Sequence, residues 1–319
     1  MVATWMRNAD MINPEILAPY MIERSILSNR FLASGVATFN QELLNMMLAG
    51  GITGKLPFYK PLSGDDEVLG DDDGEALTPG KTTTASEKYS VLARGRAFSA
   101  SDLAKAFSGD DPLKAMASMM GDYWAGRYTA ALIASLKGLF SNSSMAGLVH
   151  DITTSGDGKI TSNAVIDAKG KLGDASGKLS AIAVNSAVRD KLAKDQLIDY
   201  VRDQNLDINI PFYLGMEVIV DDSLPKDVSD NYTSYLFAPD AVAFASNAAP
   251  VPLEYDRDSL AGLDVVVTRN HFVMHPRGSS VNISGIDGET ATNTELGGDI
   301  WSRVFEVKNM GIVQFLHKI

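Results

Sequence analysis

Cysteine is absent from this chain of 319 residues, and histidine occurs only four times, at positions 150, 271, 275 and 317. The lack of thiols excludes disulfides, zinc–thiolate sites and cysteine nucleophiles. His271 and His275 lie in a β-branched and aromatic stretch without an HExxH frame, which favours structural histidines over metal ligands. No Walker loop, GxSxG elbow or GxGxxG fingerprint is present. We therefore expect no catalytic residue, no cofactor and no metal site.

Basic residues are also scarce: 28 Lys and Arg stand against 40 Asp and Glu, for a formal net charge of −12. A protein that binds nucleic acid through the phosphates needs a basic face, so this chain is not a nucleic-acid-binding protein of the usual kind. It can still enclose nucleic acid without binding it tightly. No apolar run approaches the roughly 20 residues of a membrane span, and residues 1–14 lack the apolar core of a signal peptide.

A long helix is predicted over residues 111–142. Pro112 suits the first helical position, and apolar residues such as Trp124, Leu132 and Leu136 recur at helical spacing. Roughly 30 residues make a rod about 45 Å long. Three glycines within it each cost about 1 kcal/mol relative to alanine, so packing must stabilise the helix.

Residues 52–98 predict a β-ribbon, with strands at 52–62 and 88–98 joined by about two dozen polar residues. Hairpin loops normally take about 2–5 residues, and an isolated ribbon is marginal in water. We therefore expect a neighbour to complete this ribbon. The connection carries seven acids without an intervening base: Asp65, Asp66, Glu67, Asp71, Asp72, Asp73 and Glu75. The EF-hand pattern fails here because Leu69 stands at its first ligand position, which favours a solvated or partner-facing tip over a calcium site.

The remaining pattern is that of an α+β protein. Residues 1–50 predict short helices that must pack on another part of the chain. Beyond a polar loop at 151–159, helices are predicted at 164–175 and at 186–193, the latter with Ser186 as N-cap. Strands are predicted at 179–184, 216–220, 232–237, 241–244, 264–268, 271–275 and 311–316. Residues 208–211 lead into the strand at 216–220, and a polar loop is predicted at 285–298.

Several phrases, in order along the chain, resemble the major capsid (coat) proteins of tailed bacteriophages with the HK97-type fold. These phrases are LPFYKPLSGDDEV at 56–68, RGRAFSASDLA at 94–104, SGDDP at 108–112, INIPFYLGMEVIVDD at 208–222, PVPLEYDRDSLAG at 250–262 and HFVMHPRG at 271–278. The resemblance implies an N-terminal arm (1–50), an extended loop (51–100), a peripheral domain (101–154 and 252–319) containing the spine helix 111–142, and an axial domain (155–251).

The resemblance further implies a structural protein without enzymatic activity. Copies of the chain would form the hexamers and pentamers of an icosahedral virion capsid around double-stranded DNA. Separate scaffolding, portal and decoration proteins are expected partners, and assembly is expected in the cytoplasm of the host bacterium. No sequence-specific DNA contact and no membrane contact are expected.

The residues expected at contacts between subunits lie on the predicted ribbon. They are Lys55, Phe58, Lys60, Asp65, Asp66, Glu67, Asp71, Asp72, Asp73, Arg94 and Arg96. Candidate charge partners for the acidic tip are Arg24, Arg30, Arg269 and Arg277.

Two alternatives to a phage shell are retained. One is an encapsulin-like compartment with the same fold, which would package an enzyme instead of a genome. The other, from a different class, is a soluble hydrolase that uses Asp221, Asp222 or His275. Size exclusion separates a shell from a catalytic monomer, and the presence of DNA in the particle separates a capsid from a compartment.

Overall fold

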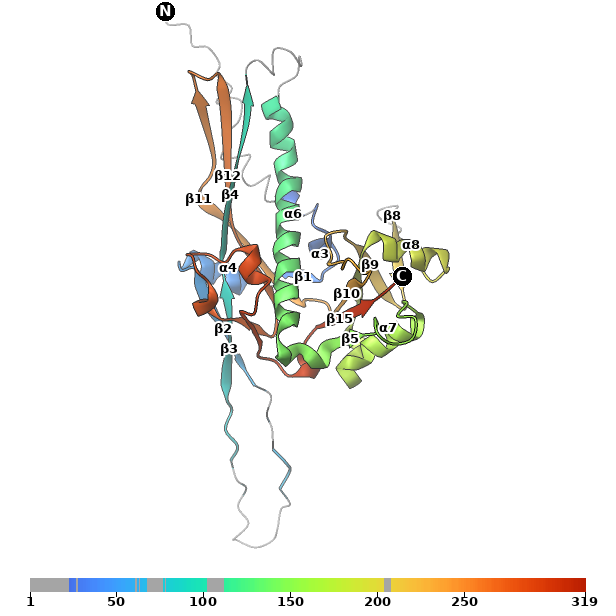
Figure 1. Cartoon of the computed structure of the whole chain (residues 1–319). Coiled ribbons are helices and arrows are strands. Elements are labelled where there is room, and N and C mark those ends of the chain that lie inside the picture. Colours follow the sequence, from blue (N-terminus) through green and yellow to red (C-terminus); the bar gives the residue numbers. More distant parts are fainter. Residues whose placement is uncertain are drawn as a thin grey trace, which may run out of the picture.

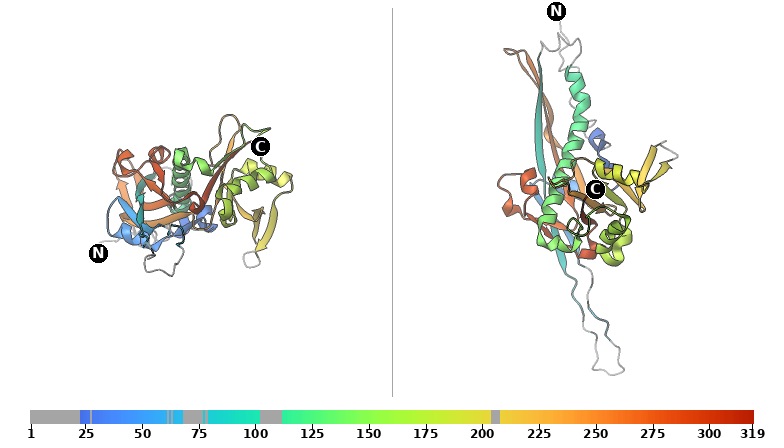
Figure 2. Two further views of the ribbon diagram at one scale, coloured as in Figure 1. Left: turned by 90° about the horizontal axis from the view of Figure 1, so that it is seen from below. Right: turned by 45° about the vertical axis from the view of Figure 1, so that its right-hand side comes forward.

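The computed structural model describes residues 23–26, 28–60, 62, 64–67, 77, 79–101, 112–203 and 208–319. One long helix, α6 (Pro112–Ser141), stands beside a tall sheet, and a second body of sheet and helices lies on the other side of it (Figure 1). A thin ribbon extends from the lower end of the tall part. The right-hand view of Figure 2 shows that the ribbon extends downward while the second body projects to the side. Among the helices of the described ranges, none has the length and apolarity needed to cross a bilayer.

The predicted spine helix is confirmed as α6, which starts at Pro112 and ends at Ser141; Asp111 lies outside the described residues. Side chains three or four positions apart, from Met120 through Trp124 and Tyr128 to Leu139, are buried, so one long face is covered by protein. Gly138 allows a close approach: a Cβ there would lie 2.0 Å from the Leu296 carbonyl oxygen. The chain at that point forms α9 (Asn293–Leu296), within the loop predicted at 285–298.

The tall sheet has four strands in the order β1 (Ala37–Phe39), β11 (Val242–Asp258), β12 (Leu263–Pro276) and β4 (Leu92–Ser101). β11 and β12 form a long antiparallel hairpin whose register shifts between Ala248 and Leu253. The separate strands predicted at 264–268 and 271–275 are therefore parts of one strand. The strand predicted at 241–244 opens β11 and belongs to this sheet, not to the axial segment where we expected it.

The second body contains a seven-stranded sheet. Its order is β5 (Val149–Asp151), β15 (Ile312–His317), β10 (Tyr232–Phe237), β6 (Ala181–Val184), β9 (Met216–Val220), β8 (Ile208–Tyr213) and β7 (Asp199–Asp203). β6 and β10 are buried along their whole length, as expected for central strands covered on both faces. β9 and β10 have the predicted bounds, whereas β7 was not predicted.

The last strand, predicted at 311–316, was assigned to the peripheral segment, and that assignment is wrong. β15 pairs antiparallel with β10 and parallel with β5, so it lies inside the seven-stranded sheet. Its apolar residues can be buried against either sheet, and the pattern of burial alone does not name the partner strand. β5, which lies in the segment 101–154 that was also assigned to the peripheral part, belongs to the same seven-stranded sheet. With these three corrections, the division into arm, loop, peripheral and axial parts remains a prediction.

Helices and short elements complete the two bodies. α7 (Ser162–Lys169) is followed by the 3₁₀ segment η2 (Gly170–Lys178), where one helix was predicted. α8 (Ser186–Lys194) is capped by the Asn185 side chain, not by Ser186 as predicted. The remaining elements are η1 (Ser143–Leu148), β13 (Ser279–Val281), η3 (Ile283–Gly285), β14 (Trp301–Arg303) and η4 (Val307–Asn309).

The first described residues pack on the rest of the chain, as predicted. α3 (Arg30–Ala33) places Phe31 edge-on to Phe237, and α4 (Gln41–Leu48) buries Leu43 and Met47 beside the tall sheet. The Asn29 and Asn40 side chains cap these two helices. Residues 1–22 lie outside the described part of the chain.

Candidate subunit interface

The ribbon consists of β2 (Thr53–Tyr59) and β3 (Thr84–Ser90), paired antiparallel from Thr53↔Ser90 to Tyr59↔Thr84. One further hydrogen bond, from the Lys60 amide to the Thr83 carbonyl at 2.9 Å, closes the paired part. The second strand was predicted at 88–98, and this is wrong. Residues 84–90 belong to the ribbon, and β4 begins at Leu92 and joins β12 in the tall sheet.

The base of the ribbon is anchored in its own subunit. Tyr89 and Val91 are buried in one apolar cluster with Leu43 and Met47 of α4. Gly54 lies opposite Tyr89 in the ladder, and a Cβ at Gly54 would come within 2.2 Å of the Tyr89 hydroxyl. Any larger residue at position 54 would therefore have to displace the buried Tyr89 side chain.

A buried polar pair lies beside this cluster. The Glu87 carboxylate is 3.4 Å from His275 Nε2 on β12, and the two side chains are 8% and 1% exposed. His275 Nε2 also lies 3.2 Å from the Ser279 carbonyl. The Ser279 carbonyl oxygen can only accept, so Nε2 is the donor in this hydrogen bond. The contact between Glu87 and His275 fixes the base of β3 on the tall sheet.

The outer half of the ribbon extends away from the rest of the subunit (Figure 1). Tyr59, Leu62 and Leu77 are 76%, 85% and 59% exposed. Lys55 and Lys60 are exposed as well, whereas Phe58 packs edge-on against Phe305 of its own subunit, with ring centroids 4.8 Å apart.

Three of the acids predicted at the tip, Asp65, Asp66 and Glu67, are described and exposed. The other three acids expected at contacts, Asp71, Asp72 and Asp73, lie outside the described residues.

The four arginines expected to meet this tip all have partners in their own subunit. Arg24 pairs with Asp122 at 3.1 Å, and its hydrogen bond, with a second from Ser28, lowers the pKa of the Asp122 carboxyl. Arg277 pairs with Asp240 at 3.0 Å. Arg269 pairs with Glu254, and Arg30 donates to the Val220 carbonyl. As partners of the acidic tip, these four remain predictions.

Arg94 and Arg96 lie on β4, outside the ribbon on which we expected them. Arg94 is half-buried and donates to the Ala291 carbonyl and to Asn293 Oδ1, while Arg96 is exposed. Arg127 of α6, which the sequence analysis did not single out, is exposed, and its guanidinium lies 5.5 Å from the centre of the Tyr123 ring. The sequence of a helix does not indicate which strand a given helix residue will face.

The residues proposed for a hydrolase are not brought together. Asp221 and Asp222 follow β9 in the seven-stranded sheet, whereas His275 is buried on β12 in the other sheet. Asp222 accepts a hydrogen bond from the Ser186 amide at 2.9 Å, and hydrogen bonds from Ser186 lower the pKa of this carboxyl. Asp221 accepts from the Ser223 amide at 2.8 Å. Asp221 therefore orders the turn after β9, and Asp222 holds the first residue of α8, in a different sheet from the histidine.

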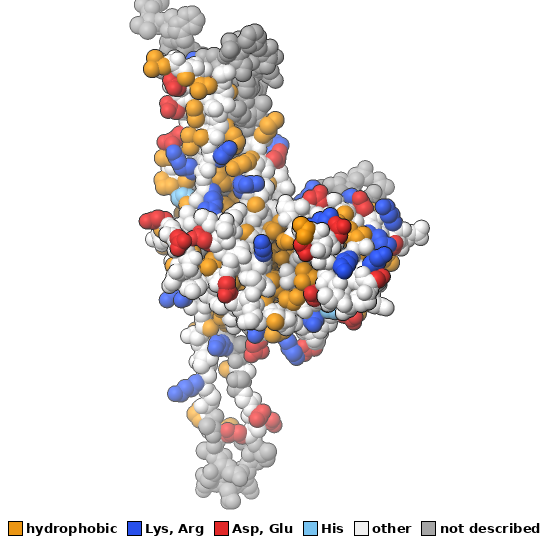
Figure 3. Space-filling view, in the orientation of Figure 1, with side chains coloured by type: hydrophobic (Ala, Val, Ile, Leu, Met, Phe, Trp, Pro, Cys, Tyr) orange, Lys and Arg blue, Asp and Glu red, His pale blue; other side chains and the backbone are white. Residues whose placement is uncertain are grey.

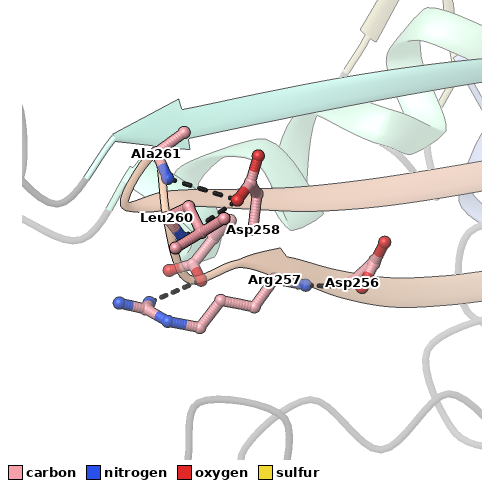
Figure 4. Close-up of polar contacts among 6 residues, drawn as sticks. Asp256, Arg257, Asp258, Leu260 and Ala261 are labelled. Atoms are coloured by element: carbon pink, nitrogen blue, oxygen red, sulfur yellow. Dashed lines mark hydrogen bonds and ion pairs between the residues drawn. The ribbon is translucent and has the colours of Figure 1, made fainter.

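The tip of the β11–β12 hairpin lies at the end of the subunit opposite the ribbon (Figure 1), and Figure 4 shows its polar contacts. The Asp258 carboxylate accepts from the amides of Leu260 and Ala261 at 3.0 and 3.2 Å, which orders the turn. Arg257 pairs at 2.7 Å with Asp264 on the facing strand. Leu260 is 99% exposed on this ordered turn. Both ends of the molecule thus carry exposed apolar side chains.

Solved phage capsids share this architecture. The chain matches the capsid of Ralstonia phage GP4 with a TM-score of 0.59 at 10% identity, over 89% of this chain and 87% of that one. It matches the capsid chain of cyanophage Pam1 with a TM-score of 0.54 at 11% identity, over 93% of each chain. At such identities the matches show the fold alone, which is the α+β capsid fold expected from the sequence.

A sequence relative defines the family. The chain is 37% identical to the major capsid protein of Bacillus phage SPP1 over 318 residues, which is 98% of each protein. No family model matches the chain. The chain therefore belongs to the major capsid proteins of tailed phages, structural proteins that build the shell of the virion and are not enzymes.

Proposed function

We propose that copies of this chain form the pentamers and hexamers of an icosahedral shell that encloses double-stranded phage DNA, and that the outer half of the β2–β3 ribbon binds a neighbouring subunit. The observation that carries this proposal is the ribbon itself: its base is buried in its own subunit, while its outer half exposes Tyr59 and Leu62. A two-stranded ribbon is marginal in water unless something covers it.

A ribbon from one subunit on the body of the next is a head-to-tail contact, and such contacts generate rings when the rotation closes. Each subunit in a ring would give one ribbon and receive one. The family relationship supports the phage capsid over an encapsulin-like compartment, because the relative that shares 37% identity is itself a phage major capsid protein.

The formal charge of −12 supports a wall that confines DNA without holding it. Scaffolding, portal and decoration proteins belong to the proposal as partners, and the host cytoplasm belongs to it as the place of assembly. The division into peripheral and axial domains likewise belongs to it, with β15 and β11 in the sheets where they pair.

The test is a chain in which residues 61–82 are replaced by Asn-Gly. Because the Lys60 amide bonds to the Thr83 carbonyl at 2.9 Å, a two-residue type I′ turn can join the strands at this point. We expect a folded subunit with an unchanged thermal transition that fails to close shells in sedimentation and electron microscopy. Closed particles of normal size would overturn the role of the ribbon.

A further inference from the structure

A groove with apolar walls and an acidic rim lies beside the base of the ribbon. It consists of two adjoining cavities of about 630 and 360 Å³, and both are lined by Ile52 and Glu289. Its walls come mainly from the turn between α4 and β2 and from the segment between η3 and α9. Figure 3 shows Asp and Glu side chains at the left-hand middle of the molecule, where α4 and the chain after β13 lie in Figure 1.

The wall that carries the acids is held in place at both of its ends. The Thr290 hydroxyl donates to the Val91 carbonyl at 2.9 Å and accepts from the Ala93 amide at 3.2 Å. At the other end, the Asp287 amide donates to the Glu295 carboxylate at 2.8 Å. The groove is therefore already formed in the single subunit, and a preformed site loses less conformational entropy when a partner binds.

The lining of the groove is largely apolar and reaches the surface. Met47 and Val91 belong to the buried cluster at the base of the ribbon. Ile52 and Ile283 are 40% and 38% exposed, and Ile286 is half-buried. Because covering exposed apolar surface is favourable, these isoleucines favour a partner that brings apolar side chains of its own.

The carboxylates at the rim are unpaired. Asp287 and Glu289 are exposed, and the described residues that line the two cavities include no Lys or Arg. Within the described part of the chain, neither carboxylate forms an ion pair or accepts a hydrogen bond. The second cavity adds the polar side chains of His271 and Asn247, which lie opposite each other in the β11–β12 ladder. A partner with basic side chains would therefore complement this rim.

We propose that this groove binds a basic amphipathic segment of a separate protein. Apolar side chains of that segment cover Ile52 and Ile283, and its Lys or Arg side chains pair with Asp287 and Glu289. The inference goes beyond the proposed function, because the closure of shells through the ribbon does not require this groove to be occupied.

The charge of the chain argues against a second copy as the partner. Each copy carries a formal charge of −12. Among the described helices, α8 has the highest proportion of basic residues, three in nine. Its Arg189 and Lys191 already pair with Asp190 and Asp195 in their own subunit, at 2.7 and 2.8 Å. The described part of the chain therefore offers no helix with free basic residues on this scale.

A dye in the groove tests the proposal, because the natural chain has no cysteine and one engineered thiol is labelled alone. Gly288→Cys lies in the lining, and a Cβ there meets only the Thr290 carbonyl oxygen, at 3.9 Å. The control is Gly80→Cys, an exposed position where a Cβ meets open space. On unassembled subunits, a synthetic amphipathic peptide of Leu and Lys should shift the emission of a polarity-sensitive dye at Gly288→Cys to the blue. The dye at Gly80→Cys should not respond, and a peptide with Glu in place of Lys should shift neither.

Calorimetric titration of unlabelled subunits measures the same contact without a dye. Asp287→Lys/Glu289→Lys should weaken binding of the Leu/Lys peptide by about tenfold, because two exposed ion pairs are lost. Asp65→Lys/Asp66→Lys makes the same change in net charge on the ribbon and should leave the affinity unchanged. Circular dichroism should show that both variants are folded. Raising the salt concentration from 0.1 to 1 M should weaken binding to the natural chain, because the Debye length falls from about 10 to about 3 Å.

Several results would overturn the proposal. They are equal affinity for the Lys and Glu peptides, equal weakening by the groove and ribbon variants, and equal blue shifts at Gly288→Cys and Gly80→Cys. A blue shift at Gly288→Cys that grows with subunit concentration in the absence of peptide would assign the groove to a second copy and overturn the assignment to a separate protein. None of these results affects the role of the ribbon, which the replacement of residues 61–82 tests by itself.

Discussion

Trp124 offers the sharpest test of how α6 is packed. Its side chain is 3% exposed, and its Nε1 donates to Thr268 Oγ1 of β12 at 3.0 Å. The Tyr123 ring lies edge-on to it at 5.6 Å. Truncating a buried Trp to Ala typically costs about 3–5 kcal/mol, a large part of the total stability of most domains. We therefore expect Trp124→Ala to give misfolded or aggregated protein, not folded subunits that fail to assemble.

The hydrogen bond can be separated from the apolar contact by milder changes. Trp124→Phe retains a ring but leaves the Thr268 hydroxyl without its donor, which should cost about 1–3 kcal/mol in the free energy of unfolding. Thr268→Val leaves the indole N–H without an acceptor and should cost a similar amount. The double variant removes both polar groups, so it should cost less than the sum of the single costs, with a coupling of about 0.5–3 kcal/mol.

The assay is urea unfolding followed by circular dichroism on unassembled subunits. Sedimentation must show that the sample is unassembled, because association stabilises the folded state and would mask the differences. Additive costs in the double variant would show that the bond makes no contribution. A Trp124→Ala chain that folds and assembles normally would refute the burial of this side chain and the phase of the helix.

Three further outcomes are expected. Gly54→Ala should destabilise the subunit by about 1–3 kcal/mol in thermal unfolding because the new methyl group displaces the Tyr89 ring, whereas Gly80→Ala, which meets open space, should have little effect. Burial lowers the pKa of His317 to about 4 from 6.5. Because the folded-state pKa is depressed, stability should be full above pH ~6.5 and fall by about 3 kcal/mol as the pH drops to about 4, and His317→Gln should remove this part of the pH dependence. Free subunits should bind duplex DNA only with a non-specific Kd of about 10⁻⁴–10⁻⁶ M in gel-shift titrations, and nanomolar, salt-sensitive binding would contradict the picture of a non-adhesive wall.

The sequence alone determined the elements whose pattern is local and strong. The spine helix needed only Pro112 at its start, apolar residues at helical spacing and a polar end, and its observed range is Pro112–Ser141. The strands β9 and β10 were predicted to the residue because turn residues bound each apolar run. The family was identified from phrases spread along the whole chain, which the relative at 37% identity confirms.

The tertiary structure alone decided which strand lies beside which. β15 was placed in the wrong body because a run of apolar residues shows that a strand is buried, not which strand it pairs with. The break at Val91, which divides the ribbon from β4, likewise depends on contacts with α4 and β12. Which strands pair depends on the packing of many residues that are far apart in the chain. The local alternation of apolar and polar residues carries no information about those contacts.

The arginines show the same division between local pattern and long-range contact. Sequence reasoning proposed Arg24, Arg30, Arg269 and Arg277 as partners for the acidic tip, and the fold gives each of them a partner in its own subunit. Arg127 was not singled out because its position near Arg94, around one cavity, exists only once α6 packs on the tall sheet. The sequence gives the charge of each residue. The groups with which that charge interacts depend on how the helix packs on the sheet, which brings together residues far apart in the chain.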